Sequence, residues 1–252
     1  LIRSRGLGDV YKRQRYMSSS QAHAANIDAG LRSYMLGVYN HMTIGMAITG
    51  FFAYLTKIMS VSNGMLTPFG TAIYASPLKW VVMLAPLGMV FWLSAKVQTM
   101  KPETARNLFY AFAAIMGISL SSLLLVFTGE SVIRVFFLTA ASFSALSIYG
   151  YTTKKNLTSF GSFLIMGLVG LILASIVNIF LASSAMQFII SVVGVLIFAG
   201  LTAYDTQRIK LMYMASDDRG TALKKSIMGA LTLYLDFINM FIMLLQLLGN
   251  RE

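Results

Sequence analysis

Long apolar stretches follow one another along most of the chain and are separated by short polar connectors. Seven of them reach about twenty residues, enough for a helix to cross a bilayer core of roughly 30 Å. They lie near residues 35–56, 79–95, 108–127, 132–151, 160–182, 187–205 and 228–248. The pattern predicts an all-α polytopic membrane protein, with seven transmembrane helices in one membrane domain at residues 34–250. The composition agrees, with 57% hydrophobic and 12% charged residues.

Residues 1–33 precede the first apolar stretch and have a different character. Residues 18–30 are small and polar, which predicts a mobile cytoplasmic tail. Residues 1–16 carry five Lys or Arg against one Asp, unlike the rest of the chain, and we interpret them as a non-native leader with Met17 as the natural start. No small-residue cleavage site precedes the first stretch, which argues against a signal peptide.

Positive charge is unevenly distributed over the connectors, and this asymmetry predicts orientation because Lys and Arg near span ends are retained on the cytoplasmic side. With the N-terminus inside, eleven basic residues lie on the cytoplasmic side and four on the outer side. The eleven are Arg32, Lys96, Lys101, Arg106, Lys154, Lys155, Arg208, Lys210, Arg219, Lys224 and Lys225, and the four are Lys57, Lys79, Arg134 and Arg251. We therefore expect a cytoplasmic N-terminus and an outer C-terminus.

The net charge of +11 is then explained by topology and by contact of the connectors with anionic lipid headgroups. A nucleic-acid-binding protein would gather its basic residues on one soluble surface with stacking aromatics, and no segment offers such a surface. The bilayer is the expected partner, and no nucleic acid is expected.

Several kinds of chemistry are disfavoured by composition. The chain has no cysteine, which excludes disulfides, thiolate zinc sites and cysteine nucleophiles. Its two histidines, His23 and His41, are too scattered for a transition-metal site, and we interpret His41 as a helix-packing residue. No phosphate-binding loop or nucleophile elbow is found. We expect neither enzymatic activity nor a tightly bound cofactor.

Two aspartates lie inside or at the edge of the apolar stretches, Asp205 in VLIFAGLTAYDTQRIK and Asp236 in IMGALTLYLDFINMFIMLLQLLG. A charged side chain at the centre of a membrane helix costs roughly 2.5 to 3.5 kcal/mol on insertion scales, so such a residue indicates function. Asp205 ends the sixth predicted span, and Arg208 lies on the same helix face, so a structural ion pair is the alternative. Asp236 has no neutralising neighbour on its own helix face.

The sixth and seventh spans are antiparallel, and we expect them to bring these carboxyl groups within hydrogen-bonding distance. Two acids that close share a proton and titrate as one unit. Such a pair can be a pH-responsive cation site in a pore, or the catalytic pair of an intramembrane aspartyl protease. The protease would have Gly-x-Gly-Asp at the acid and Pro-Ala-Leu after it, whereas Tyr234 and Leu235 precede Asp236 and all four prolines precede the third span. Proteolysis is thus a remote alternative.

Small and hydroxylated residues inside the spans are typical of helix–helix contacts in membranes. Small-xxx-small pairs occur at Ala113 and Gly117, Ala141 and Ala145, and Gly170 and Ala174. Ser119, Ser121, Ser122, Ser144 and Ser147 are candidates for interhelical hydrogen bonds. We expect all of these residues to serve packing.

Several segments resemble the transmembrane Bax-inhibitor-motif family, in particular its bacterial branch. They are YLDFINMFIMLLQLLG in the last span, YDTQRIK after the sixth, LFYAFAAIMGISL in the third, and NIF at residues 178–180, within a similarity from about Gly30 to Gly249. The resemblance implies two three-helix layers around a central, hydrophobic C-terminal helix, in the bacterial inner membrane. It also implies a pH-sensitive calcium leak gated by paired aspartates, whose two acids match Asp205 and Asp236.

One position departs from that resemblance. A bacterial calcium-leak member has an Arg after FWM in the second span as a partner for the acids, whereas here FWL is followed by Ser94. Lys96 lies about 200° round the helix from Ser94 and would have to reach back, and Arg208 is another candidate for this latch. Calcium prefers more oxygens than two carboxylates supply, so Asn239, Thr232, backbone carbonyls or water would complete its shell.

The resemblance also leaves a second function open, because some bacterial relatives bind and restrain a membrane-anchored AAA protease. Residues 18–30 would then be the handle, and ion flux would be secondary. Deleting this tail should abolish tethering and leave a leak nearly intact, whereas Asp236→Asn should do the reverse.

Overall fold

The computed structural model describes residues 5–97 and 99–251, with side chains described from Ala29 onward. The seven predicted spans are all helices long and apolar enough to cross a membrane, as expected of an all-α polytopic membrane protein. These helices are α1 (Arg5–Ser60), α3 (Leu78–Lys96), α4 (Pro102–Leu120) with its short continuation α5 (Leu123–Val126), α6 (Gly129–Thr152), α7 (Thr158–Leu181), α8 (Ser184–Leu211) and α9 (Arg219–Leu248).

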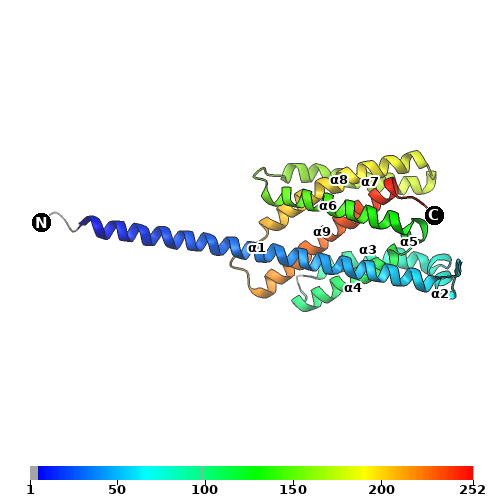
Figure 1. Cartoon of the computed structure of the whole chain (residues 1–252), viewed down its shortest axis with the longest axis horizontal. Helices are drawn as coiled ribbons and strands as arrows, with labels where there is room; N and C mark the ends of the chain where they lie inside the picture. Colours follow the sequence, from blue (N-terminus) through cyan, green and yellow to red (C-terminus); the bar gives the residue numbers. More distant parts are fainter. Residues whose placement is uncertain (1–4, 98, 252) are drawn as a thin grey trace.

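The first helix is longer than its apolar stretch. Its membrane-spanning part is Ala29–Ser60, but α1 itself begins at Arg5 and projects beyond the bundle (Figure 1). The segment predicted as a mobile tail is therefore helical in the structure. The side chains of residues 5–28, which include His23 and much of this tail, lie outside the described part.

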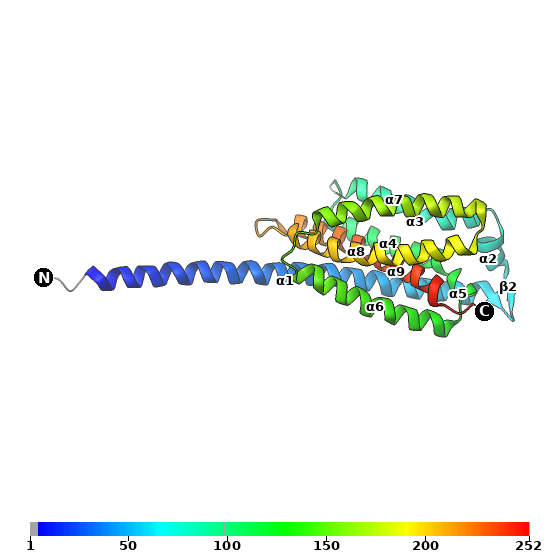
Figure 2. The same cartoon turned by 90° about the horizontal axis from the view of Figure 1, so that it is seen from above.

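Six of the seven spanning helices are grouped in two layers, with the C-terminal helix between them. One layer contains α1, α3 and α4, the other contains α6, α7 and α8, and α9 packs against α1, α4, α6 and α8. Figure 1 shows α9 running obliquely between the two layers, and Figure 2 shows the same bundle from above. The central position that the resemblance implied for the last helix is confirmed.

The connections follow local signals. After α1, Asn63 and Gly64 both have positive φ, at 50° and 76°, and form the turn of a two-residue hairpin between β1 (Val61–Ser62) and β2 (Met65–Leu66). An Asn-Gly pair favours this turn because both residues tolerate the left-handed region. The short helix α2 (Pro68–Gly70) and the π-helical turn η1 (Thr71–Ala75) lead into α3.

Two helix boundaries differ from the prediction where they matter for the aspartates. The sixth spanning helix ends at Leu211 rather than at residue 205, and the seventh begins at Arg219 rather than at residue 228. Asp205 therefore lies well inside α8, and Asp236, 17 residues after Arg219, lies about 25 Å along α9. The prediction failed here because the polar ends of both helices lower the hydropathy on which it was based.

The early start of α9 is explained by its cap. The carboxylate of Asp218 accepts hydrogen bonds from the backbone N–H of Gly220 at 2.8 Å and of Thr221 at 3.1 Å, and from the Thr221 hydroxyl at 2.6 Å. These bonds satisfy free N–H groups at the helix start. The hydrogen bonds of Thr221, led by that of its hydroxyl, lower the pKa of Asp218.

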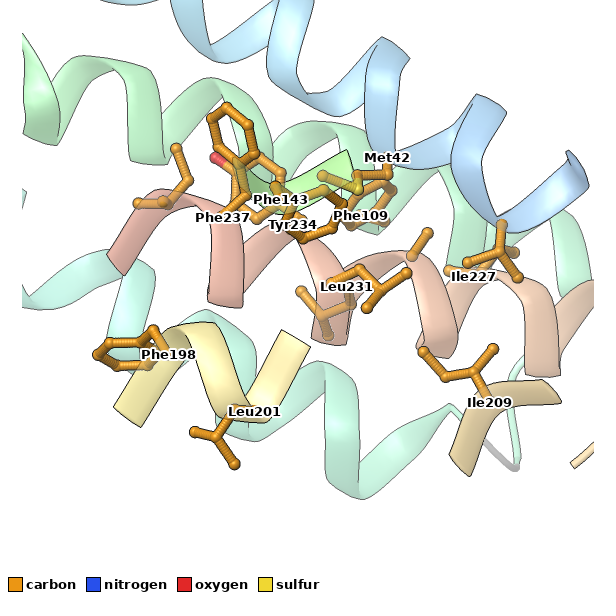
Figure 3. Packing of buried hydrophobic residues seen from close by; sticks show 14 of the residues in the cluster. Met42, Phe109, Phe143, Phe198, Leu201, Ile209, Ile227, Leu231, Tyr234 and Phe237 are labelled. Carbon is orange, nitrogen blue, oxygen red and sulfur yellow. The ribbon is translucent and has the colours of Figure 1, made fainter. Parts of the chain in front are cut away.

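The core is a layer of apolar side chains around α9. Figure 3 shows Tyr234 near Phe109 and Met42 on one side of this helix, and Phe198 and Leu201 on the opposite side. Tyr234 and Phe109 are fully buried, and their rings meet edge to face with centroids 5.8 Å apart. Burial of α9 on both sides makes it the helix that holds the layers together.

Only part of the predicted small-residue packing is found. Ala113 and Gly117 are buried, and Gly117 faces the backbone of Thr49 on α1, so this pair does pack. Ala141 and Ala145 are exposed, and Gly170 has open space beside it, so these positions do not form close helix contacts.

The serines divide in the same way. Among the five, Ser121 and Ser147 bond to residues of other helical segments, whereas Ser122 and Ser144 bond to carbonyls of their own segment.

His41 bonds through Nδ1 to the Tyr110 hydroxyl at 2.8 Å, which fits the packing role predicted for it.

Candidate functional site

Asp205 on α8 and Asp236 on α9 lie together in the interior of the bundle. Their relative exposures are 7% and 5%, and their side chains are in direct hydrogen-bonding contact. The two antiparallel helices pack closely along their length, which brings residues distant in sequence to one place. The expected meeting of the two acids is therefore present in the structure.

A hydrogen bond between two carboxyl groups has a chemical requirement, because an ionised carboxylate only accepts. One of the two must carry a proton for the contact to be a bond. Oδ2 of Asp236 is buried and has no hydrogen-bond donor among the described residues. The pair thus has an unused acceptor that a second proton, a cation or water would satisfy.

Among the described residues, Arg208 is the cation that forms an ion pair with this site. Its Nη1 is 4.0 Å from Oδ1 of Asp205, and its side chain is 63% exposed. An ion pair at this distance and exposure contributes little, about 0 to 1 kcal/mol. The structural alternative, in which Arg208 fully neutralises Asp205, is therefore weakened, although Arg208 does favour negative charge on Asp205 rather than on Asp236.

The other predicted supporting residues lie elsewhere. Ser94 and Lys96 near the end of α3 are exposed, and Lys96 forms no ion pair with the aspartates among the described residues. The Asn239 amide donates to the carbonyl of Leu235 at 2.8 Å, and the Thr232 hydroxyl donates to the carbonyl of Met228 at 3.1 Å. Both side chains thus donate their hydrogen bonds to backbone carbonyls of their own helix. Of the predicted latch set, Arg208 is the member that forms an ion pair with the acids among the described residues.

The donor set can be compared with the needs of calcium. Ca²⁺ takes six to eight oxygen ligands, and two carboxylates provide at most four. Within the described residues, no group of three or more His, Cys, Asp or Glu side chains comes together. The pair does not fit a resident calcium site, but it suits a proton or a cation that keeps part of its water.

The sequence segment YDTQRIK has further roles that were not predicted. The Thr206 hydroxyl lies 2.9 Å from the Ser147 hydroxyl, which lies 2.6 Å from the Tyr39 hydroxyl, so a chain of three hydroxyls joins α8, α6 and α1. The Gln207 amide bonds both the carbonyl of Lys155 and the N–H of Leu157, and so holds the α6–α7 connection. The two residues that follow Asp205 therefore tie this part of α8 to α6 and to the α6–α7 connection.

The last-span motif likewise holds α9 in place. The Tyr234 hydroxyl lies 2.6 Å from the Thr49 hydroxyl, which is also within hydrogen-bonding distance of the Ala113 carbonyl on α4. Near the C-terminal end of α9, Gln246 bonds to Gln187 and Ser191 of α8. Polar contacts at the middle of the helix and near its C-terminal end therefore set its position relative to its neighbours, and with it the contact between the two acids.

Comparison with known proteins agrees with this architecture. Residues 31–252 match the family described as Inhibitor of apoptosis-promoting Bax1. The chain is 48% identical over 231 residues to a Caulobacter vibrioides protein, covering 90% of this chain and 92% of that one. It is 43% identical over 226 residues to the inner membrane protein YbhL of Escherichia coli, covering 89% and 94%. A membrane protein of Streptococcus pyogenes is 32% identical over 233 residues, with 89% and 96% covered.

Proposed function

The chain belongs to the Inhibitor of apoptosis-promoting Bax1 family of membrane proteins, and we propose that it is a pH-sensitive calcium leak of a bacterial inner membrane, gated by Asp205 and Asp236. The observation that carries this proposal is the buried contact between the two carboxyl groups, with one oxygen of Asp236 unpartnered. The relative named as an inner membrane protein supports the location.

In the proposed mechanism, a proton and Ca²⁺ compete for the same oxygens. With a proton between them, the acids hold α8 and α9 together by a hydrogen bond. When that proton leaves, two negative charges face each other in a medium of low dielectric constant and repel. A divalent cation relieves the repulsion, so it is attracted to the site, and the helices separate enough for it to pass. Calcium is the cargo here and not a structural part of the protein.

The test is calcium entry into dye-loaded liposomes as a function of pH. We expect parent protein to admit calcium with a marked pH dependence, whereas Asp205→Asn and Asp236→Asn lose that dependence because an amide cannot take part in the proton exchange. Glu103→Gln removes an exposed acid of α4 and is the matched control, which should behave like the parent. If parent, Asp205→Asn and Asp236→Asn leak alike at every pH, the proposal fails.

A second candidate function is supported by the shape of α1, whose N-terminal part projects beyond the bundle (Figure 2). A projecting helix is suited to hold a partner such as a membrane-anchored protease. In the same liposomes, a variant lacking residues 1–28 should leak like the parent if the leak is the function. If that deletion instead abolishes capture of the protease in the native membrane, while Asp236→Asn leaves capture unchanged, tethering is favoured.

Replacing one acid of this pair should stabilise the protein, whereas most substitutions destabilise a protein. Asp236→Asn keeps the shape of the side chain but removes one of two facing acids, so it should raise the free energy of unfolding by about 1 to 3 kcal/mol at alkaline pH. The gain should shrink as the pH falls, because a proton shared by the parent acids removes the repulsion. Asp205→Asn should raise the free energy of unfolding by a smaller amount, because Arg208 already favours the negative charge of Asp205. Unfolding in detergent micelles, followed by circular dichroism at several pH values, measures both; a loss of stability at alkaline pH would show that the charge is structural.

A further inference from the structure

A long crevice separates α1 from α6. Both helices pack closely against α9, whereas their contact with each other is sparse and includes the Tyr39–Ser147 hydrogen bond. Two cavities of about 650 and 670 Å³ lie between them, and both are lined by Met46 and Phe136, so they adjoin along α1 and α6; together they are called the crevice. Figure 1 shows α9 crossing between these two helices, which makes it the floor.

The walls and floor are predominantly apolar. Met35, Met42, Phe143 and Phe237 line one half, and Ile238 is among the residues of the other. Figure 3 shows Met42, Phe143 and Phe237 gathered on the same side of α9. From Arg32 to Lys57 the crevice follows 25 residues of α1, about 37 Å, which is comparable to the thickness of a bilayer. Each half has a volume within the range of roughly 300 to 1,000 Å³ that is usual for ligand sites.

Basic side chains stand at the two mouths. Arg32 lines one end of the crevice and Lys57 lines the other. Arg32 is exposed and forms no ion pair with any described residue. Beside this mouth, Lys210 donates to the carbonyl of Tyr151, another lining residue, at 2.7 Å, and its Nζ lies 4.9 Å from the Tyr151 ring centre. The Arg32 mouth therefore combines two cations with an apolar interior.

We infer that this crevice is a binding site for an anionic phospholipid, with its phosphate at Arg32 and an acyl chain between α1 and α6 over Phe237. A guanidinium forms paired hydrogen bonds with phosphate oxygens, and the long apolar interior matches an alkyl chain. The Tyr39 and Ser147 hydroxyls, which line the same half, give the glycerol ester oxygens polar neighbours. The charge at the mouth selects the lipid by its headgroup, which an ordinary lipid-facing surface would not do.

The inference stands apart from the calcium leak, because lipid retention is measured without calcium. Purified full-length protein is incubated with phosphatidylglycerol or phosphatidylcholine of the same acyl chains, and native mass spectrometry counts the lipids that stay bound. We expect the parent to retain phosphatidylglycerol several-fold better. Arg32→Gln should reduce this retention to the phosphatidylcholine level, whereas Arg219→Gln, a change of another exposed arginine, should not.

The interior is tested with a second matched set. Ala140→Phe places a ring inside the crevice and should abolish retention of both lipids, whereas Ala141→Phe, at an exposed neighbour that does not line it, should have no effect. Ser144→Phe at the exposed rim is the alternative if Ala140→Phe fails to fold. Equal retention of the two lipids by the parent, or unchanged retention in both filled variants, would overturn the inference. A parent dimer that Ser144→Phe converts to monomer would assign the crevice to a second copy of the chain instead.

Discussion

Replacing Tyr234 by alanine should lower the free energy of unfolding by about 3 to 5 kcal/mol, the cost of removing a large aromatic side chain from a packed core. Tyr234 is fully buried on the central helix, and its ring meets Phe109 and Phe112 edge to face at centroid distances of 5.8 and 5.7 Å. Its loss would leave a cavity where α9 meets α4, and the surrounding helices are fixed by other contacts and cannot close it.

Tyr234→Phe separates the ring from the hydroxyl. It removes only the 2.6 Å contact with Thr49, and the Thr49 hydroxyl keeps the carbonyls of Gly45 and Ala113 as acceptors, so the expected loss is about 1 kcal/mol. Reversible unfolding in mixed micelles, followed by circular dichroism, measures both variants. A phenylalanine variant as unstable as the alanine variant would mean that the polar contact, and not aromatic packing, holds α9 here.

The seven spans were predictable because an apolar stretch of about twenty residues has few stable alternatives to a membrane helix. Helix ends were predicted less well. Asp218 caps α9 before Arg219, and its polar first turns extend past the apolar window. The hydrophobic pattern marks the part of a helix that lies in the membrane. The end of the helix is set by hydrogen bonds such as those of Asp218 with Gly220 and Thr221.

The acid pair was predictable for a similar reason. A carboxylate in an apolar stretch is visible in the sequence. Two consecutive antiparallel helices usually pack against each other, which can bring their acids together. The cationic partner was not predictable, because a long basic side chain can reach in several directions. The structure places Arg208 4.0 Å from Asp205 and leaves Lys96 exposed. Likewise, nothing in the sequence indicated that Gln207 would hold the α6–α7 connection.

The small residues show most clearly what sequence spacing cannot predict about helix contacts. The spacing of Gly170 and Ala174 is the same as that of Ala113 and Gly117, but Gly170 has open space beside it whereas Gly117 lies against the α1 backbone. A close contact of the other layer, at Gly150, belongs to none of the predicted pairs. Spacing tells which residues share a helix face, and only the arrangement of neighbouring helices decides whether that face is in contact or faces lipid.

Gly150→Val should therefore be strongly destabilising, by about 3 kcal/mol, whereas Gly170→Val should change stability by less than about 1 kcal/mol. A Cβ at Gly150 would collide with the backbone carbonyl of Ala203 on α8, and a backbone atom cannot rotate away as a side chain can. Relief would require α6 and α8 to separate at a point one turn from the Ser147–Thr206 hydrogen bond.

Both variants put the same β-branched residue in a helix interior, so the difference between their unfolding free energies isolates the contact between α6 and α8. Ala203 lies two residues before Asp205, so this contact also sets the depth of the acid in the bundle. A folded Gly150→Val protein should consequently show a weakened pH dependence of calcium entry, although it keeps both aspartates. Equal stability of the two variants would mean that α6 can move away from α8 at little cost, and that the position of Asp205 depends on α9 alone.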